Sequence, residues 1–381
     1  ACLNYVENGK AVPDDMALGA FDVAGQFHIP EKLYGREKEL ATLLAAYERA
    51  GRGQSEMVLV AGYSGTGKSA LVYEVHKPVT ASRGYFISGK FDQYQRSTPH
   101  YAFIRALEDF VELLLTEDEA SLNGWKELIL EAVGSNGRLL TEVIPNLELI
   151  IGPQPGVSEQ GPVEAQNRFH YTFQQFIHAV AKPAHPLVIF IDDLQWADLS
   201  SLHLLSDLLK GVRSAGLLMI GAYRDNEVDA QHPFFKTLAG LRAGGIQPET
   251  IQIHNLLPEH VQQLVLDTLQ EPEGLANLIY RKTQGNCFFT IEFLKSLYED
   301  QLLVFDEKNQ SWKWSVAAIA ARGITDNVVE LMAGKIGKMH PMTQQVLSLA
   351  ACIGNKFDLD TLAVIDQQDP GTRLEPGTLD P

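Results

Sequence analysis

The stretch Met57-Val-Leu-Val-Ala61, followed at once by Gly62-Tyr-Ser-Gly-Thr-Gly-Lys-Ser69, decides the fold of this chain. Its first five residues are apolar and partly β-branched, which predicts a short buried strand. The next eight fit the pattern G-x-x-x-x-G-K-[ST], and the run Ala70 to Val75 behind them predicts a helix. Strand, glycine-rich loop and helix in this order predict a loop that binds the phosphates of ATP together with Mg²⁺. The alternative is a glycine-rich turn without a ligand, which would not require a strand before it and a helix after it.

Each residue type in the loop suits one part of the nucleotide. Glycines let successive N–H groups turn toward the phosphates. Lys68 is predicted to reach the β- and γ-phosphates and to assist catalysis, and the Ser69 hydroxyl to bind Mg²⁺. The residues predicted to bind the nucleotide here are Gly62, Ser64, Gly65, Thr66, Gly67, Lys68, Ser69 and Ala70.

A second apolar stretch, Leu187-Val-Ile-Phe-Ile191, ends in the two carboxylates Asp192 and Asp193. A buried parallel strand delivers its last residues to the crevice where ligands bind. Asp192 is therefore predicted to hold Mg²⁺, and Asp193 to activate the water that attacks the γ-phosphate. The alternative is that these acids cap the next helix, 199–209, although Asp198 is the better candidate for that cap.

The stretch Leu217 to Ala222 predicts another buried strand, and Arg224 follows it closely. Because neighbouring parallel strands end at the same edge of a sheet, Arg224 is predicted to contact the γ-phosphate and to stabilise developing charge. An ion pair with Asp225 or Glu227 is the alternative. Arg168, on the predicted helix before the second strand, is assigned to structural pairing.

The remaining pattern extends this arrangement into an α/β fold. Apolar strands alternate with long helices as far as residue 255, which predicts a parallel sheet covered by helices on both faces. Beyond 256 helices dominate, with one hairpin between 302 and 314 that suits a winged-helix-like module. Buried strands are also predicted at 84–88 and 250–253, and helices at 100–115, 163–181, 258–270, 274–283, 287–299, 326–338 and 342–352.

These patterns divide the chain into five predicted segments. They are a linker from a preceding domain (1–32), an ATPase core (33–255), a helical lid (256–300), a winged-helix-like domain (301–366) and an irregular tail (367–381). A start without methionine and the irregular end lead us to expect a piece of a longer protein.

Composition narrows the class of partner. Among 381 residues, 48 acidic side chains outnumber 31 basic ones and give a net charge of −17, which repels nucleic acid and anionic lipid. Three separated cysteines form neither a disulfide framework nor a zinc motif, so a reducing cytoplasm is expected. No apolar run is long enough to span a bilayer, and we expect a soluble protein without a membrane partner.

Five segments together resemble the signalling NTPases of the STAND class, within the AAA-like P-loop ATPases. They are Leu33-Tyr-Gly-Arg-Glu37, the loop 62–69, Ile191-Asp-Asp-Leu-Gln-Trp-Ala-Asp198, Tyr223-Arg-Asp-Asn226 and Thr283-Gln-Gly-Asn-Cys-Phe-Phe289. More narrowly, the chain is similar to the central ATPase region of large bacterial, often cyanobacterial, multidomain kinases. In these a serine/threonine kinase-like domain precedes the region, and sensor and histidine-kinase domains follow.

The resemblance carries further expectations about ligand contacts. It implies that Leu33, Tyr34 and Gly35 lie against the adenine and that Gly285 and Cys287 belong to a lid over the base. The family has proline where Cys287 stands, so a small apolar thiol would fill part of that place. The resemblance also implies a switch that is closed with ADP, opened by ATP and reset by slow hydrolysis. Its partners would be the flanking kinase and sensor domains or further copies of the chain.

Two other functions are compatible with these residues: a ring-forming remodelling ATPase, and a nucleotide-binding scaffold without turnover. Protein phosphorylation by this chain is not among them, since the sequence has no H-R-D or D-F-G motif.

Overall fold

A computed structural model of the chain describes residues 27–93, 98–158, 161–211, 216–270, 274–309, 311–321 and 328–353. The chain divides into two compact units. One combines residues 1–35 with 255–331, and the other combines 36–254 with 332–381. Most of the predicted linker 1–32, the end of the winged-helix-like segment and the whole predicted tail 367–381 lie outside the described residues. The predicted domain boundaries stay predictions.

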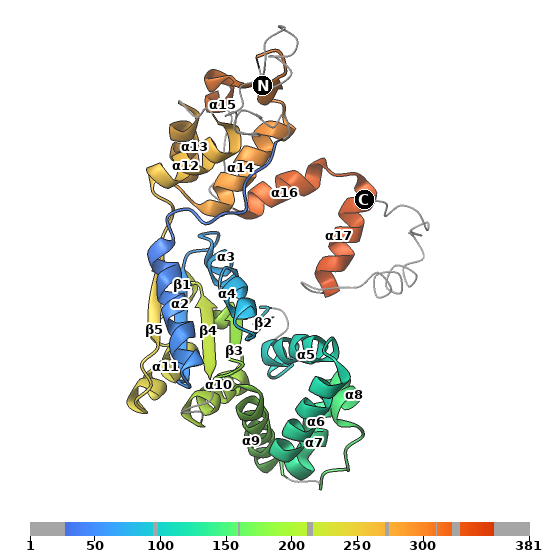
Figure 1. Cartoon of the computed structure of the whole chain (residues 1–381). Coiled ribbons are helices and arrows are strands. Elements are labelled where there is room, and N and C mark those ends of the chain that lie inside the picture. The colour runs from blue at the N-terminus through green and yellow to red at the C-terminus, as the bar shows by residue number, and fades with distance from the viewer. Residues whose placement is uncertain are drawn as a thin grey trace, which may run out of the picture. The chain divides into compact units, whose positions relative to one another are not determined.

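The unit around the phosphate-binding loop is built on a five-stranded parallel sheet (Figure 1). The strand order is β2-β3-β4-β1-β5, and every neighbouring pair is parallel. This confirms the α/β fold with a parallel sheet that the sequence predicted. The strands are β1 (Glu56–Gly62), β2 (Tyr85–Lys90), β3 (Leu187–Asp192), β4 (Leu217–Tyr223) and β5 (Glu249–Ile253).

Two predicted strands need correction. The strand predicted at 84–88 begins at Tyr85 and continues to Lys90, which brings a charged side chain to its end. The strand predicted as buried at 250–253 is an edge strand, and only Ile251 and Ile253 are buried in β5. Successive side chains of a strand point to opposite faces of the sheet, and in β5 those that share a face with Ile251 and Ile253 are the more buried set.

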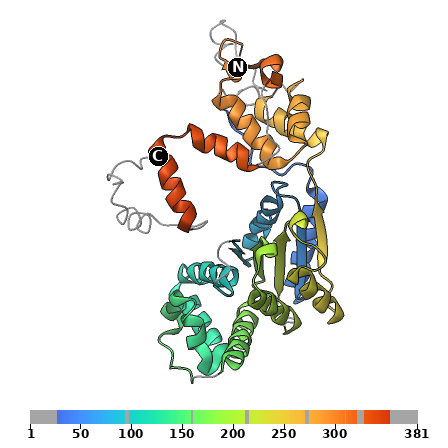
Figure 2. The same ribbon diagram turned by 180° about the vertical axis from the view of Figure 1, so that it is seen from behind.

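Helices cover both faces of the sheet, as Figures 1 and 2 show from opposite sides. In β1, Met57 and Leu59 point to one face of the sheet and share a core with one group of helices. Val58 and Val60 alternate with them, point to the other face and are fully buried. The first group contains α5 (Tyr101–Leu115), α9 (Pro162–Val180), α10 (Leu199–Gly211) and α11 (Pro233–Ala243). On the opposite face α2 (Glu37–Gly51), α3 (Lys68–Tyr73) and α4 (His76–Ala81) contact the strands.

A helical segment not singled out from the sequence lies between α5 and α9. It contains α6 (Glu119–Val133), α7 (Gly137–Thr141) and α8 (Glu148–Ile151), and α6 packs against α9. Asp118 caps α6 by accepting hydrogen bonds from the backbone N–H groups of Ala120 and Ser121, both at 3.0 Å.

The other unit is mainly helical, as predicted. Its core combines Tyr34 and Leu256 with apolar side chains from the helices and from the hairpin. The elements are α12 (Pro258–Leu269), α13 (Leu275–Thr283), α14 (Cys287–Glu299), the antiparallel strands β6 (Leu303–Asp306) and β7 (Ser311–Trp314), and α15 (Val316–Ala321). Two further predicted helices are confirmed as α16 (Val328–Lys338) and α17 (Pro341–Ile353); the division between the units falls within α16, and α17 is grouped with the unit that holds the sheet.

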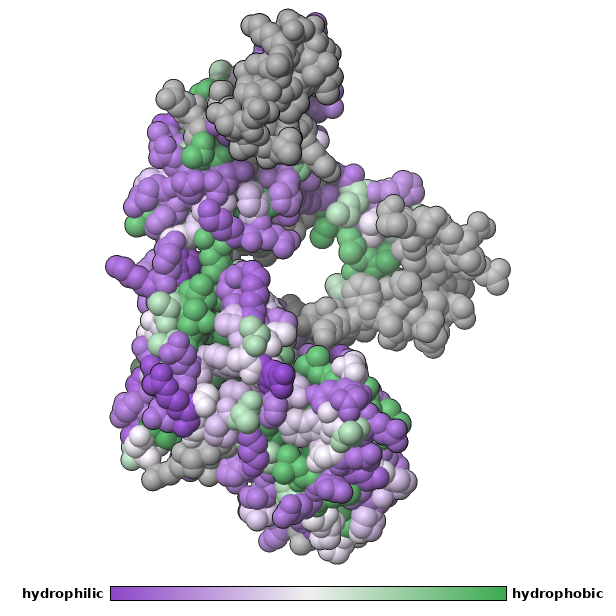
Figure 3. Space-filling model, in the orientation of Figure 1, coloured by the Kyte–Doolittle hydropathy of each residue, from purple (hydrophilic) through white to green (hydrophobic). Residues whose placement is uncertain are grey.

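The surface seen in Figure 3 is mainly hydrophilic, with apolar residues in scattered patches. Among the described helices, none combines the length and hydrophobicity needed to cross a membrane.

Candidate nucleotide site

The loop between β1 and α3 has the backbone of a phosphate-binding loop. Gly65 and Gly67 adopt positive φ angles of 77° and 93°, which turn the chain tightly before the helix begins at Lys68. The Lys68 ammonium donates to the carbonyl oxygens of Gly62 and Tyr63, each at 2.8 Å. Burial lowers the pKa of Lys68, and the nearby Asp192 opposes this change. The ammonium is therefore held over the loop by two neutral acceptors.

The two predicted metal ligands lie side by side. The Ser69 hydroxyl donates to Oδ2 of Asp192 at 2.8 Å, although the residues are 123 positions apart in sequence. The other carboxylate oxygen of Asp192 accepts a hydrogen bond from the backbone N–H of Asp193 at 2.8 Å. A hydroxyl and a carboxylate are oxygen donors of the kind that Mg²⁺ prefers, so these residues fit the ion. When bound there, the ion would neutralise phosphate charge.

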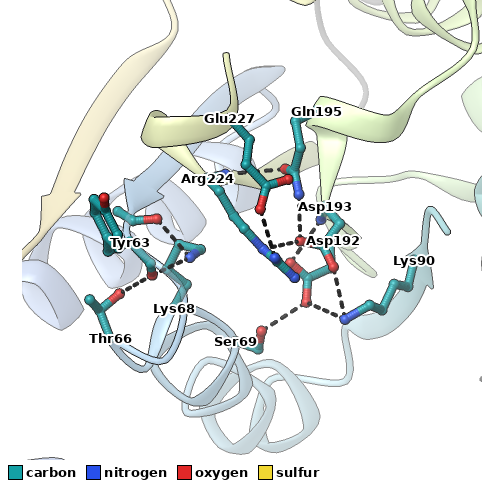
Figure 4. A network of polar contacts seen from close by, with 11 residues as sticks. Tyr63, Thr66, Lys68, Ser69, Lys90, Asp192, Asp193, Gln195, Arg224 and Glu227 are labelled. Carbon is teal, nitrogen blue, oxygen red and sulfur yellow. Dashed lines mark hydrogen bonds and ion pairs between the residues drawn. The ribbon is translucent and has the colours of Figure 1, made fainter. Parts of the chain in front are cut away.

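Asp193 is the most constrained residue of the site (Figure 4). It is 3% exposed and has a φ angle of 54°, an uncommon conformation for a residue other than glycine. Its carboxylate forms ion pairs with Lys90 Nζ at 2.9 Å and with Arg224 Nε at 3.2 Å. Gln195 donates a third contact, from Nε2 to Oδ1 at 2.8 Å. The side chain is thus enclosed by two cations and an amide.

These partners determine the charge of Asp193. Burial alone would raise the pKa of the carboxyl, but hydrogen bonds from Lys90 and Gln195 and the charges of Lys90 and Arg224 outweigh it and lower the pKa. A carboxylate with a lowered pKa is a weaker base. In this arrangement Asp193 is better placed to hold the two cations than to accept a proton from water.

Arg224 follows the end of β4, which pairs with β3 as predicted. Besides Asp193, its guanidinium contacts Glu227 through Nη1 at 2.7 Å and lies over the ring of Trp196, 4.7 Å from the ring centre. The predicted ion pair with Glu227 is therefore present together with the contact to the end of β3. Arg168 serves a structural role, donating to Asn136 Oδ1 at 2.8 Å.

The residues after Asp193 show which aspartate caps the next helix. Asp198, and not Asp192 or Asp193, caps α10, accepting from Ser201 N–H at 2.9 Å. Trp196 packs against the core. Gln195 joins the ends of β3 and β4, because its Oε1 accepts from the Arg224 N–H at 3.1 Å.

Sequence reasoning missed Lys90, Gln195 and Arg36. Lys90 ends β2, the strand beside β3, and a polar residue at the end of an apolar run is a feature that could have identified it. Arg36 is 6% exposed and donates to the carbonyl oxygens of Thr66 at 3.3 Å and His254 at 2.5 Å. It lies in a segment quoted for its resemblance, but no local pattern indicates these two contacts.

The predicted adenine and lid residues lie in the other unit, where their local roles are structural. Tyr34 is 7% exposed and donates to Asp267 Oδ2 at 3.1 Å. Gly285 has a φ angle of 72°, and a Cβ there would lie 2.0 Å from the Leu256 carbonyl oxygen, so only glycine fits. The contacts of Leu33, Tyr34, Gly35, Gly285 and Cys287 with a nucleotide stay predictions.

Comparisons with known proteins show what the chain is similar to. Residues 32–220 match the family model described as the AAA ATPase domain. The chain is 33% identical over 93% of its length to the hybrid signal transduction histidine kinase G of Dictyostelium discoideum, of which it covers 12%. It is 24% identical over 48% of its length to histidine protein kinase 1 of Candida albicans, of which it covers 8%. The chain thus corresponds to a small part of much longer relatives.

Among solved structures, a STAND protein with a tetratricopeptide repeat sensor from Pyrococcus horikoshii aligns with a TM-score of 0.42 and 13% identity, covering 91% of this chain and 39% of that one. Cdc6p from Pyrobaculum aerophilum aligns with a TM-score of 0.44 and 14% identity, covering 85% of this chain and 75% of that one.

Proposed function

We propose that this chain is a regulatory ATPase module of a multidomain signal-transduction kinase, which binds ATP or ADP with Mg²⁺ and hydrolyses ATP slowly. The supporting observation is the position of Asp193, held between Lys90 and Arg224 next to the Ser69–Asp192 pair. The long kinase relatives and the AAA ATPase match of residues 32–220 support the same proposal.

The ion pairs suggest how the site would respond to the γ-phosphate. Arg224 is shared between Asp193 and Glu227, so an anion of higher charge near the loop competes for its guanidinium. Withdrawal of Arg224 would remove one of the two cations beside Asp193 and leave Gln195 as the partner of Oδ1. Hydrolysis restores the original pairing, so the three side chains Lys90, Asp193 and Arg224, here called the Asp193 clamp, would distinguish ATP from ADP.

Arg36 offers a route from the loop to the rest of the chain. Its guanidinium contacts the loop at Thr66 and the end of β5 at His254. The chain passes between the two units at three places, and two of these lie at Arg36 and His254: between Gly35 and Arg36 and between His254 and Asn255. A movement of the loop would therefore act directly on both connections.

A scaffold without turnover is the second candidate function. It is favoured by the lowered pKa of Asp193, since a carboxylate held by two cations activates water poorly. A ring-forming ATPase would need an arginine from a neighbouring copy at the nucleotide. No observation among the described residues points to such an arginine, so we do not propose this function.

The test is to measure nucleotide binding and ATP hydrolysis for the full chain and two variants. Lys68→Ala should abolish binding of ATP and ADP, because it removes the only lysine of the phosphate-binding loop. Asp193→Asn should keep ADP bound but reduce the hydrolysis rate by at least about tenfold, because it removes the charge that holds Lys90 and Arg224 at the site.

Three outcomes would contradict the proposal. Micromolar ATP affinity in Lys68→Ala would refute the loop assignment. An unchanged rate in Asp193→Asn would favour the scaffold. A rate per molecule that rises steeply with protein concentration would favour the ring-forming ATPase.

A further inference from the structure

A second cavity lies at the opposite edge of the same sheet from the phosphate-binding loop. It has a volume of about 590 Å³, within the range of small-molecule sites. Tyr85 at the start of β2 and His185 just before β3 line it, whereas Lys90 and Asp192 at the ends of these strands belong to the nucleotide site. The cavity, here called the aromatic cavity, is lined chiefly by Arg83, Tyr85, Glu117, Gly124, Trp125 and His185.

Three inclined rings form one wall of the aromatic cavity. The ring centres of Tyr85 and Trp125 are 5.8 Å apart with an interplanar angle of 77°, and those of Trp125 and His185 are 6.4 Å apart at 65°. Tyr85 and His185 are 6.5 Å apart at 47°. The faces of aromatic rings carry negative potential and attract cations.

The carboxylate of Glu117 lies among these rings. It accepts hydrogen bonds from the Tyr85 hydroxyl and, at 3.0 Å, from Trp125 Nε1. Burial and this carboxylate raise the pKa of Tyr85, so the phenol remains a donor at neutral pH. Both donors are neutral and orient Glu117 without cancelling its charge. No ion pair of the described residues gives Glu117 a basic partner, and the basic side chains of α5 and α7, such as Arg105 and Arg138, pair with other acids.

His185 adds an acceptor, and Arg83 adds a cation. His185 Nδ1 lies 3.1 Å from the carbonyl oxygen of Arg83, which can only accept, so Nδ1 carries the proton. In the neutral ring Nε2 is then an acceptor. The exposed Arg83 guanidinium lines the same cavity and has no acidic partner among the described residues.

We propose that the aromatic cavity binds a small zwitterion with an ammonium group and a carboxylate, the chemistry of a free amino acid. The ammonium would lie against the rings and Glu117, and the carboxylate within reach of Arg83. Opposite charges at separate places in one cavity suit a ligand that carries both, and a purely cationic or anionic ligand would meet repulsion at one of them. This site is independent of the nucleotide function proposed above.

Gly124 provides a way to close the cavity without disturbing the fold. It is exposed on α6, and a Cβ added there meets no atom within 4 Å. Gly240 on α11 is an exposed helical glycine with the same open surroundings, and it does not line the cavity. Phenylalanine at either position replaces a poor helix former, so both variants should fold.

The experiment is calorimetric titration of the full chain with the common L-amino acids, one at a time. At least one should bind the wild type and Gly240→Phe equally, and bind Gly124→Phe and Glu117→Gln at least about tenfold more weakly. For the tightest binder, the amine without the carboxylate and the N-acetyl derivative without the charge should each bind at least about tenfold more weakly. ADP binding should be the same in all four proteins.

The proposal is overturned if no amino acid binds the wild type at millimolar concentration, or if Gly124→Phe binds as the wild type does. Equal binding of the amine and the parent amino acid would show that Arg83 does not bind the carboxylate. It would contradict the proposal that the ligand is a zwitterion. Loss of ADP binding with amino-acid binding intact would instead count against the proposed nucleotide function alone.

Discussion

At the scale of single residues, the charge of Asp193 is the central feature of the site. Its pKa is lowered because Lys90, Gln195 and Arg224 together outweigh the effect of burial. The reciprocal effect holds for Lys90, where burial lowers the pKa but the hydrogen bond to Asp193 and the charges of Asp192 and Asp193 raise it overall. Each partner therefore stabilises the charged form of the other.

Lys90→Met tests this pairing through stability. Asp193 is buried, so removing one of its partners should lower the free energy of unfolding at neutral pH by about 1–2 kcal/mol. Lys77→Met is the control, because Lys77 is exposed on α4 and, among the residues that the structure describes, pairs only with Glu74; it should cost less than about 0.5 kcal/mol. Urea unfolding followed by circular dichroism gives both values, and equal losses would refute the pairing.

At the scale of elements, the site exists because parallel strands end at one edge. β1, β3 and β4 bring the loop, the two aspartates and Arg224 together there, and β2 adds Lys90. His100 at the start of α5 has a different role, since it connects helices. Its ring stacks on Phe169 of α9 with centres 5.1 Å apart, and its backbone N–H donates to Ser201 Oγ on α10 at 3.0 Å.

His100 should make this contact sensitive to acid. Burial, with a smaller effect of the neighbouring His170 and an opposing one of Asp198, lowers the pKa of His100 to about 4. The unfolded chain then binds a proton more readily, so stability is constant above the unfolded pKa of about 6.5 and falls as the pH drops toward 4. At about pH 5 the loss from this residue should be about 2 kcal/mol relative to neutral pH.

His100→Asn is the matched variant, because asparagine tolerates the positive φ angle of 61° at this position. Urea unfolding of wild type and variant at about pH 7.5 and about pH 5 isolates the contribution of His100 from other titrating groups. The wild type should lose more stability over this interval than the variant. Equal losses would show that His100 does not resist protonation.

At the scale of the whole molecule, Arg36 lies next to one of the places where the chain passes between its two units and contacts His254 next to another. The buried guanidinium contacts Thr66 in the phosphate-binding loop and His254, the last residue before the chain passes to the other unit. Arg36 itself is the first residue of that unit. One side chain thus ties the loop to two of the places where the chain passes between the units.

Hydrogen exchange measured with and without nucleotide tests this connection. In the wild type, ADP should slow exchange of backbone amides in the loop and in residues 254–256. Arg36→Ala should keep the change in the loop and lose most of the change at 254–256. Arg52→Ala, at the exposed end of α2, is the control and should behave as the wild type. An unchanged response in Arg36→Ala would exclude this route.

The sequence by itself determined the parallel α/β core, the phosphate-binding loop, the two aspartates after β3 and Arg224 after β4. Strand and helix periodicities are local, and the end of a parallel strand has a known position in a sheet. Only the tertiary structure decided that Lys90 and Arg224 enclose Asp193 and that Arg36 holds the loop. Those contacts depend on the strand order β2-β3-β4-β1-β5, which joins residues separated by 30 to 218 positions, and no local periodicity encodes such pairings.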